Sequence, residues 1–143
     1  MRSYRRSPAR RALNLVVRPL ARLGLTGPRT HLLTVPGRRT GQQWSTPVSL
    51  VEWGGERFAV APYGERNWVK NARVAGFVDV RRGRRRERLV VNELSPEQAV
   101  PVLREYHRRS RVTHSLFDVQ QSSPDSAWLA EAPRHPVFRL RPE

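Results

Sequence analysis

Residues 31–61 read HLLTVPGRRTGQQWSTPVSLVEWGGERFAVA, and this stretch decides the fold. It contains three apolar runs that favour strands, at His31–Val35, Gln43–Trp53 and Arg57–Ala61. The turn Pro36–Gly41 separates the first two runs, and Gly54–Gly55 separates the last two. Connections this short join antiparallel strands, because a parallel pair needs a long crossover. The stretch therefore predicts a succession of antiparallel hairpins.

Helices and further strands are expected on both sides of this stretch. Ser95-Pro96-Glu97-Gln98 predicts the start of a helix, because Ser95 can cap it and Gln98 completes a capping box. Antiparallel hairpins with helices around them favour a barrel with peripheral helices, in the α+β class but mainly β, and one domain over residues 1–143. The remaining expected elements are an amphipathic basic helix at about 8–24, a helix at 67–75, a hairpin of 77–81 and 88–91 around Gly83, helices at 95–109 and 123–130, and a strand at 136–140.

The composition restricts the chemistry and the partners. The 143 residues include no cysteine, which excludes thiolate nucleophiles and Cys-ligated metals. Lys and Arg number 27 against 12 Asp and Glu, for a formal charge of +15, and Lys70 is the only lysine. Nucleic acid, an anionic membrane or a polyanionic small molecule would each suit this charge. No apolar run is long enough to span a bilayer, so we expect a cytoplasmic protein.

Motifs of the common nucleotide-binding and catalytic sites are absent from the sequence. There is neither a G-x-G-x-x-G nor a Walker-type phosphate loop. None of the four histidines pairs with another at a metal-ligand spacing, so we expect no metal site. If the protein is an enzyme, its reactive atoms belong to a cofactor, and the chain supplies binding, orientation and electrostatics.

Two segments carry the features of a binding site. In the first, Gly37-Arg38-Arg39-Thr40-Gly41, a tight turn exposes backbone N–H groups beside two guanidinium groups and a hydroxyl, which suits a phosphate or carboxylate. In the second, residues 60–73, a strand ends at Pro62-Tyr63-Gly64 and a helix then begins. The N–H groups at such a helix start favour anions.

Together these segments resemble the deazaflavin (F-420)-dependent nitroreductase family. The motifs that carry the resemblance are LTxxGRRTG with TPV downstream, and VAPYG followed by NWVKNAR. The resemblance implies a flavin-reductase-like split β-barrel that binds coenzyme F-420 and transfers hydride to an electron-poor organic acceptor. A quinone, a nitro compound and an enone all stay open as the acceptor. Many relatives carry an arginine just after the GRRTG turn, where this chain has Trp44.

The resemblance also assigns roles to individual residues. Arg38, Arg39, Thr40 and Gly41 would hold the phosphate and the acidic tail of the coenzyme. Residues that would line or border the deazaflavin ring are Pro47, Val48, Ala61, Tyr63, Gly64, Trp68 and Asn71. The residues themselves show no obvious acid or base for the acceptor, so its proton would come from solvent or from the phenol of Tyr63 or Tyr106.

Other interpretations stay open at this point. The run Arg81-Arg82-Gly83-Arg84-Arg85-Arg86 would suit nucleic acid, although it lacks interleaved aromatic residues. The same barrel could bind FMN or haem instead, or carry the coenzyme without turnover. The basic flank of the helix at 8–24 would allow contact with the anionic inner face of a membrane, or its apolar face would pack on the barrel. The oligomeric state stays open as well, with a homodimer as one of the alternatives.

Overall fold

The computed structural model describes residues 30–143, and six antiparallel strands in this part form a closed barrel. Around the barrel the strands follow the order β1-β2-β3-β6-β5-β4. Their bounds are β1 Thr30–Pro36, β2 Gln43–Trp53, β3 Glu56–Val60, β4 Phe77–Arg82, β5 Arg85–Glu93 and β6 Val137–Pro142. The hairpins expected from the sequence are confirmed, and β5 begins three residues earlier than the expected strand at 88–91.

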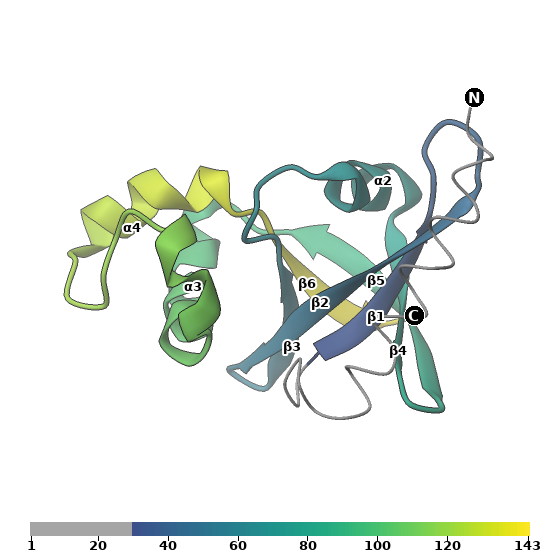
Figure 1. The fold of residues 1–143 in the computed structure, drawn as a ribbon, viewed down its shortest axis with the longest axis horizontal. Coiled ribbons are helices and arrows are strands. Elements are labelled where there is room, and N and C mark those ends of the chain that lie inside the picture. The colour runs from purple at the N-terminus through teal and green to yellow at the C-terminus, as the bar shows by residue number, and fades with distance from the viewer. Residues whose placement is uncertain (1–29) are drawn as a thin grey trace.

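Two groups of helices accompany the barrel (Figure 1). Helix α2 (Asn67–Ala75) lies across one end and packs on β1, β2, β4 and β5. Helices α3 (Pro96–Arg109) and α4 (Asp125–Glu131) lie beside the barrel, where α3 contacts β2, β3 and β6. The short 3₁₀ helices η1 (Arg111–Leu116) and η2 (Ala132–Arg134) belong to this second group and were not expected from the sequence. The expected helix at 8–24 lies outside the described residues.

Alternation along the strands places apolar side chains in two separate cores. On β3, Ala59 points into the barrel, whereas Phe58 and Val60 point outward beneath the helices. Successive side chains of a strand face opposite sides, so a fully apolar strand has to be covered on both. The interior of the barrel is closed by Val69 and Ala72 of α2. Helices α3 and α4 cover the outer face with a second core that includes Leu103, Tyr106, Phe117 and Trp128.

Helix α3 has the start that the sequence predicts. The Ser95 hydroxyl accepts a hydrogen bond from the Gln98 N–H, and the Gln98 side chain accepts one from the Ser95 N–H. The helix continues through Pro101 to Arg109. Pro101 leaves the carbonyl of Glu97 without its helical donor, and Glu97 is exposed, so water can replace that donor.

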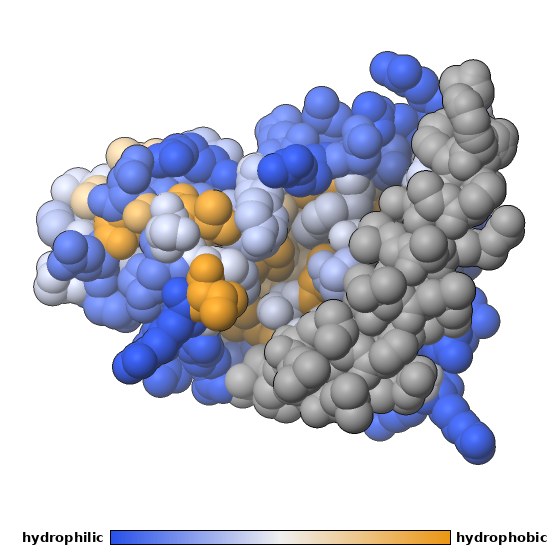
Figure 2. Space-filling view, in the orientation of Figure 1, coloured by the Kyte–Doolittle hydropathy of each residue, from blue (hydrophilic) through white to orange (hydrophobic). Residues whose placement is uncertain are grey.

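The visible surface of the described residues is mainly hydrophilic (Figure 2). Hydrophobic residues show as small, separate patches, several of them on the side of α3 and α4. No helix of residues 30–143 is long and apolar enough to cross a bilayer.

Candidate functional site

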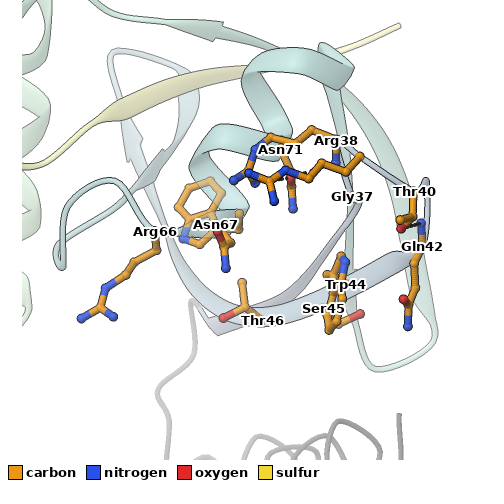
Figure 3. A pocket seen from close by; sticks show the side chains of 12 residues that line it. Gly37, Arg38, Thr40, Gln42, Trp44, Ser45, Thr46, Arg66, Asn67 and Asn71 are labelled. Atoms are coloured by element: carbon orange, nitrogen blue, oxygen red, sulfur yellow. Dashed lines mark hydrogen bonds between the residues drawn. The ribbon is translucent and has the colours of Figure 1, made fainter. Parts of the chain in front are cut away.

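A pocket opens between the β1–β2 turn, strand β2 and the start of α2. Its volume is about 550 Å³, within the range typical of small-molecule sites. Asn71 and Arg38 lie on one side and face Trp44, Ser45 and Thr46 of β2 (Figure 3). The lining residues are Gly37, Arg38, Arg39, Thr40, Gln42, Trp44, Ser45, Thr46, Arg66, Asn67, Trp68 and Asn71.

The β1–β2 turn is closed by its own backbone. Gly37 donates to the carbonyl of Gln42 at 2.7 Å and accepts from the N–H of Gly41 at 2.9 Å. Gly41 has a φ of 78°, a conformation that glycine adopts without strain. Gly37 is needed for space, because a Cβ there would lie 2.9 Å from the Trp44 indole nitrogen. The turn therefore has a fixed shape and packs closely on β2.

Asn71 fixes the first arginine of the turn. Its amide oxygen accepts two hydrogen bonds from Arg38, one from the backbone N–H at 3.0 Å and one from Nη1 at 2.8 Å. Asn71 is 3% exposed, so helix α2 holds it in place. The Arg38 guanidinium is thus oriented by a neutral partner and keeps its full charge for a ligand.

The pocket has a concentration of uncompensated positive charge. Arg38, Arg39 and Arg66 line it, and no Asp or Glu is among the lining residues. Within residues 30–143, none of these three arginines forms an ion pair. Most carboxylates of the same part do pair with arginines elsewhere. The site is therefore suited to an anion.

Glu65 shows how a nearby carboxylate is kept from the pocket arginines. It directly precedes Arg66, but its side chain accepts a hydrogen bond from Arg73 at 3.0 Å. That hydrogen bond lowers the pKa of the Glu65 carboxyl below its usual value. Arg73 also binds Glu93, so the acidic groups close to α2 are gathered around it.

The start of α2 adds backbone donors and an aromatic wall. Arg66 provides no side-chain cap for this helix, so its first N–H groups lack a side-chain acceptor within the described part of the chain. Trp68 packs on Phe138 of the barrel core with 5.8 Å between ring centroids. Trp68 also lines the pocket. A planar apolar wall beside cationic groups suits a ligand that combines an aromatic ring with anionic groups.

The structure brings five of the sequence-predicted site residues into the pocket: Arg38, Arg39, Thr40, Trp68 and Asn71. Val48 and Ala61 are buried in the barrel core, and Gly41, Pro47 and Gly64 lie outside the lining set. Tyr63 is 62% exposed next to the pocket, with the Arg66 guanidinium 5.6 Å from its ring centroid.

Tyr106 is placed away from the pocket. It is 5% exposed in the second core, where its ring lies 6.2 Å from that of Phe117. The side chain belongs to the buried face of α3 that forms part of this second core. The interpretation of Tyr106 as a proton donor at the site is therefore corrected.

Six lining residues were missed by the sequence analysis: Gln42, Trp44, Ser45, Thr46, Arg66 and Asn67. Strand alternation contained a signal for two of them. Trp44 and Thr46 are four and two residues before Val48, which faces the barrel interior, so they extend the same face towards the turn. Arg66 and Asn67 follow from the predicted helix start, but only the fold shows that this start meets the β1–β2 turn.

Residues 7–127 match the family described as F420H(2)-dependent quinone reductase. The chain belongs to this family. It is therefore a reductase, and the family implies coenzyme F420 as its reductant. A search of curated proteins finds no match.

Solved structures share the barrel of this F420-dependent reductase. An F420-H2 dependent reductase, FDR-A, is 19% identical over 80% of this chain and 95% of its own, with a TM-score of 0.57. A protein described as a domain-swapped dimer is 18% identical over 94% and 99%, with a TM-score of 0.56. The heme storage protein HutZ of Vibrio cholerae is 14% identical over 87% and 89%, with a TM-score of 0.53. At these identities the likeness shows the split-barrel fold, as the sequence analysis expected.

Proposed function

We propose that this reductase holds the anionic tail of coenzyme F420 against Arg38, Arg39 and Arg66, and its deazaflavin ring beside Trp68 and Thr46. The observation that supports this most is the set of three pocket arginines that form no ion pair within residues 30–143, one of them oriented by the buried Asn71. A tail with a phosphodiester and several glutamates needs such charge, and the donors in the pocket fit it. The expected contacts of Gly41, Pro47, Val48, Ala61, Tyr63 and Gly64 with the coenzyme stay predictions.

The acceptor is proposed to be an electron-poor organic molecule, and the family favours a quinone over a nitro compound or an enone. When bound, the reduced coenzyme supplies the hydride. The chain orients the ring and the acceptor. No lining residue is an Asp, Glu or His, so the proton is proposed to come from solvent or from the exposed phenol of Tyr63. A homodimer is proposed as well, and the neighbour described as a domain-swapped dimer supports it.

Coenzyme preference tests the proposed function directly. We expect F420 to bind at least about tenfold more tightly than FMN, a difference of roughly 1.4 kcal/mol, because the F420 tail offers more negative charge to the pocket. Fluorescence titration of the purified protein with each coenzyme measures this. Equal affinity, or tighter binding of FMN, would reject the proposal.

A pair of double variants tests where the tail binds. We expect Arg38→Ala with Arg39→Ala to weaken F420 binding by roughly tenfold or more, since charge-assisted hydrogen bonds to the tail are lost. The fold should persist, because the Asn71 oxygen still accepts the backbone N–H at position 38.

The matched control is Arg84→Ala with Arg86→Ala. Both residues are exposed in the β4–β5 hairpin, and this change removes the same charge from the molecule. We expect its F420 affinity to stay near that of the unaltered protein. The reverse pattern, with loss only in the hairpin variant, would place the tail along the hairpin.

A further inference from the structure

A buried histidine connects the helical layer to the segment that leads into the pocket. His135 is 2% exposed, and its Nδ1 lies 2.9 Å from the carbonyl oxygen of Pro62. The oxygen can only accept, so Nδ1 donates this hydrogen bond. His135 follows η2 in the helical layer, whereas Pro62 lies between β3 and α2, 73 residues earlier in the chain.

Glu131 holds the other side of the imidazole ring. Its carboxylate lies 2.6 Å from His135 Nε2, and Glu131 is itself 4% exposed. The same carboxylate accepts from the Asp118 N–H and from Arg134, both at 3.3 Å. Phe117 stacks on the imidazole at 4.0 Å between centroids. The ring therefore cannot turn without leaving buried polar groups unpaired, which is costly.

The segment held by His135 leads to Arg66, which lines the pocket. The Ala61 N–H donates to the carbonyl of Pro136 at 2.8 Å, next to the His135 contact. Within the segment, Gly64 donates to the Ala61 carbonyl and Arg66 donates to the Gly64 carbonyl. The Arg66 carbonyl then accepts from the first turn of α2. A continuous set of hydrogen bonds thus runs from the buried imidazole to the pocket.

Gly64 lies within ordinary van der Waals distance of the residues before β6, and its backbone conformation favours glycine. It has a φ of 92°, and a Cβ at this position would meet the Arg134 carbonyl at 3.5 Å. The segment from Ala61 to Arg66 is therefore packed against the residues just before β6. Its position depends on the helical layer as well as on the barrel.

We propose that His135, fixed by Glu131, is a positioning residue for the coenzyme pocket. By donating to Pro62 it sets the course of residues 61–66, and thereby the placement of Arg66 and the start of α2. This inference rests on the proposed function for its effect on coenzyme binding. The anchoring itself can be measured without coenzyme.

Two substitutions at His135 separate the two sides of the ring. Asparagine places an amide donor near the position of Nδ1, and glutamine places one near Nε2. We expect His135→Asn to keep the bond to Pro62 and lose the contact with Glu131, and His135→Gln to do the reverse. Both lose one buried hydrogen bond and the aromatic stacking, so similar drops in melting temperature are expected.

The F420 affinity should then distinguish the variants. We expect His135→Gln to weaken F420 binding about fivefold, the order of one hydrogen bond, and His135→Asn to stay within about twofold of the unaltered protein. Amide hydrogen exchange of residues 61–68, measured without coenzyme, should rise in His135→Gln alone. Equal affinities, or equal exchange in this segment, would overturn the positioning role.

A measurement on the unaltered protein covers the case in which a variant fails to fold. The ¹⁵N spectrum of histidine-labelled protein should show a protonated Nδ1 at His135. A bare Nδ1 would exclude the bond to Pro62 and overturn the proposal. If F420 does not bind at all, the proposed function fails, while the exchange and ¹⁵N results still decide whether His135 anchors the segment.

Discussion

Asn71 shows at the scale of one residue how a neutral side chain can organise a charged site. Its oxygen receives both the backbone N–H and the guanidinium of Arg38, and it is almost completely buried. An acidic residue would make the same two bonds but would cancel the charge that the pocket presents. The amide therefore orients the arginine without competing with a bound anion.

The substitution Asn71→Asp tests this distinction. The shape and both hydrogen bonds are kept, so the melting temperature should stay close to that of the unaltered protein. We expect F420 binding to weaken by roughly tenfold, because the new carboxylate pairs with Arg38 and repels the tail. Thermal unfolding and fluorescence titration measure the two effects. An unchanged affinity would mean that Arg38 does not bind the tail.

At the scale of an element, α3 combines local and tertiary causes. The capping box at Ser95 fixes where the helix begins, and the apolar face that includes Val102 and Leu103 fixes which side packs on the barrel. The local sequence signals where the helix begins. Packing of the apolar face adds most of the stability, because short helices depend on packing.

Removing the cap should affect stability and leave the site intact. We expect Ser95→Ala to lower the free energy of unfolding by about 1 kcal/mol, since the Gln98 N–H loses its acceptor. Ser126→Ala, at an exposed position within α4, is the matched control and should be close to neutral. Chemical denaturation measures both, and F420 affinity should be unchanged. Equal stability of the two variants would contradict the role of the cap.

At the scale of the whole molecule, three of the four histidines gather in the helical layer. His107 and His114 stack with 3.8 Å between centroids, and His135 lies against Phe117. His107 is 4% exposed, and its Nδ1 faces the amide of Gln121 at 2.8 Å. Burial, with a smaller effect of a charge on His114, lowers the pKa of His107 below its ordinary value.

This shift predicts the direction of a pH effect on stability. The unfolded chain takes up a proton at His107 near its ordinary pKa of about 6.5, whereas the folded protein does so only at lower pH. The contribution of neutral His107 to the free energy of unfolding is therefore fully present above about pH 6.5 and is lost as the pH falls below that value.

Denaturation of the unaltered protein and of His107→Asn at about pH 7.5 and pH 5.5 tests this effect. Asparagine keeps an acceptor near the Gln121 amide but does not titrate. We expect the stability of the variant to fall less on acidification. An equal fall in both proteins would show that His107 is not the group responsible.

The sequence by itself determined the elements and their antiparallel order. Glycine turns at 36–41 and 54–55, the alternation in the strands and the capping box at Ser95 are local signals, and each acts within a few residues. The two anion-binding motifs and the family resemblance that they carry also pointed to Arg38, Arg39, Thr40, Trp68 and Asn71, all of which line the pocket.

Only the tertiary structure decided how these parts meet. Barrel closure and the packing of α2 bring Arg66 and Asn71 to the β1–β2 turn. The hydrogen bond between Arg38 and Asn71 shows this, because it joins residues 33 positions apart in the chain. The tertiary structure also places Tyr106 in the second core and brings His135 within hydrogen-bonding distance of Pro62. Contacts between distant segments depend on how the sheet closes, and composition and periodicity do not carry that information.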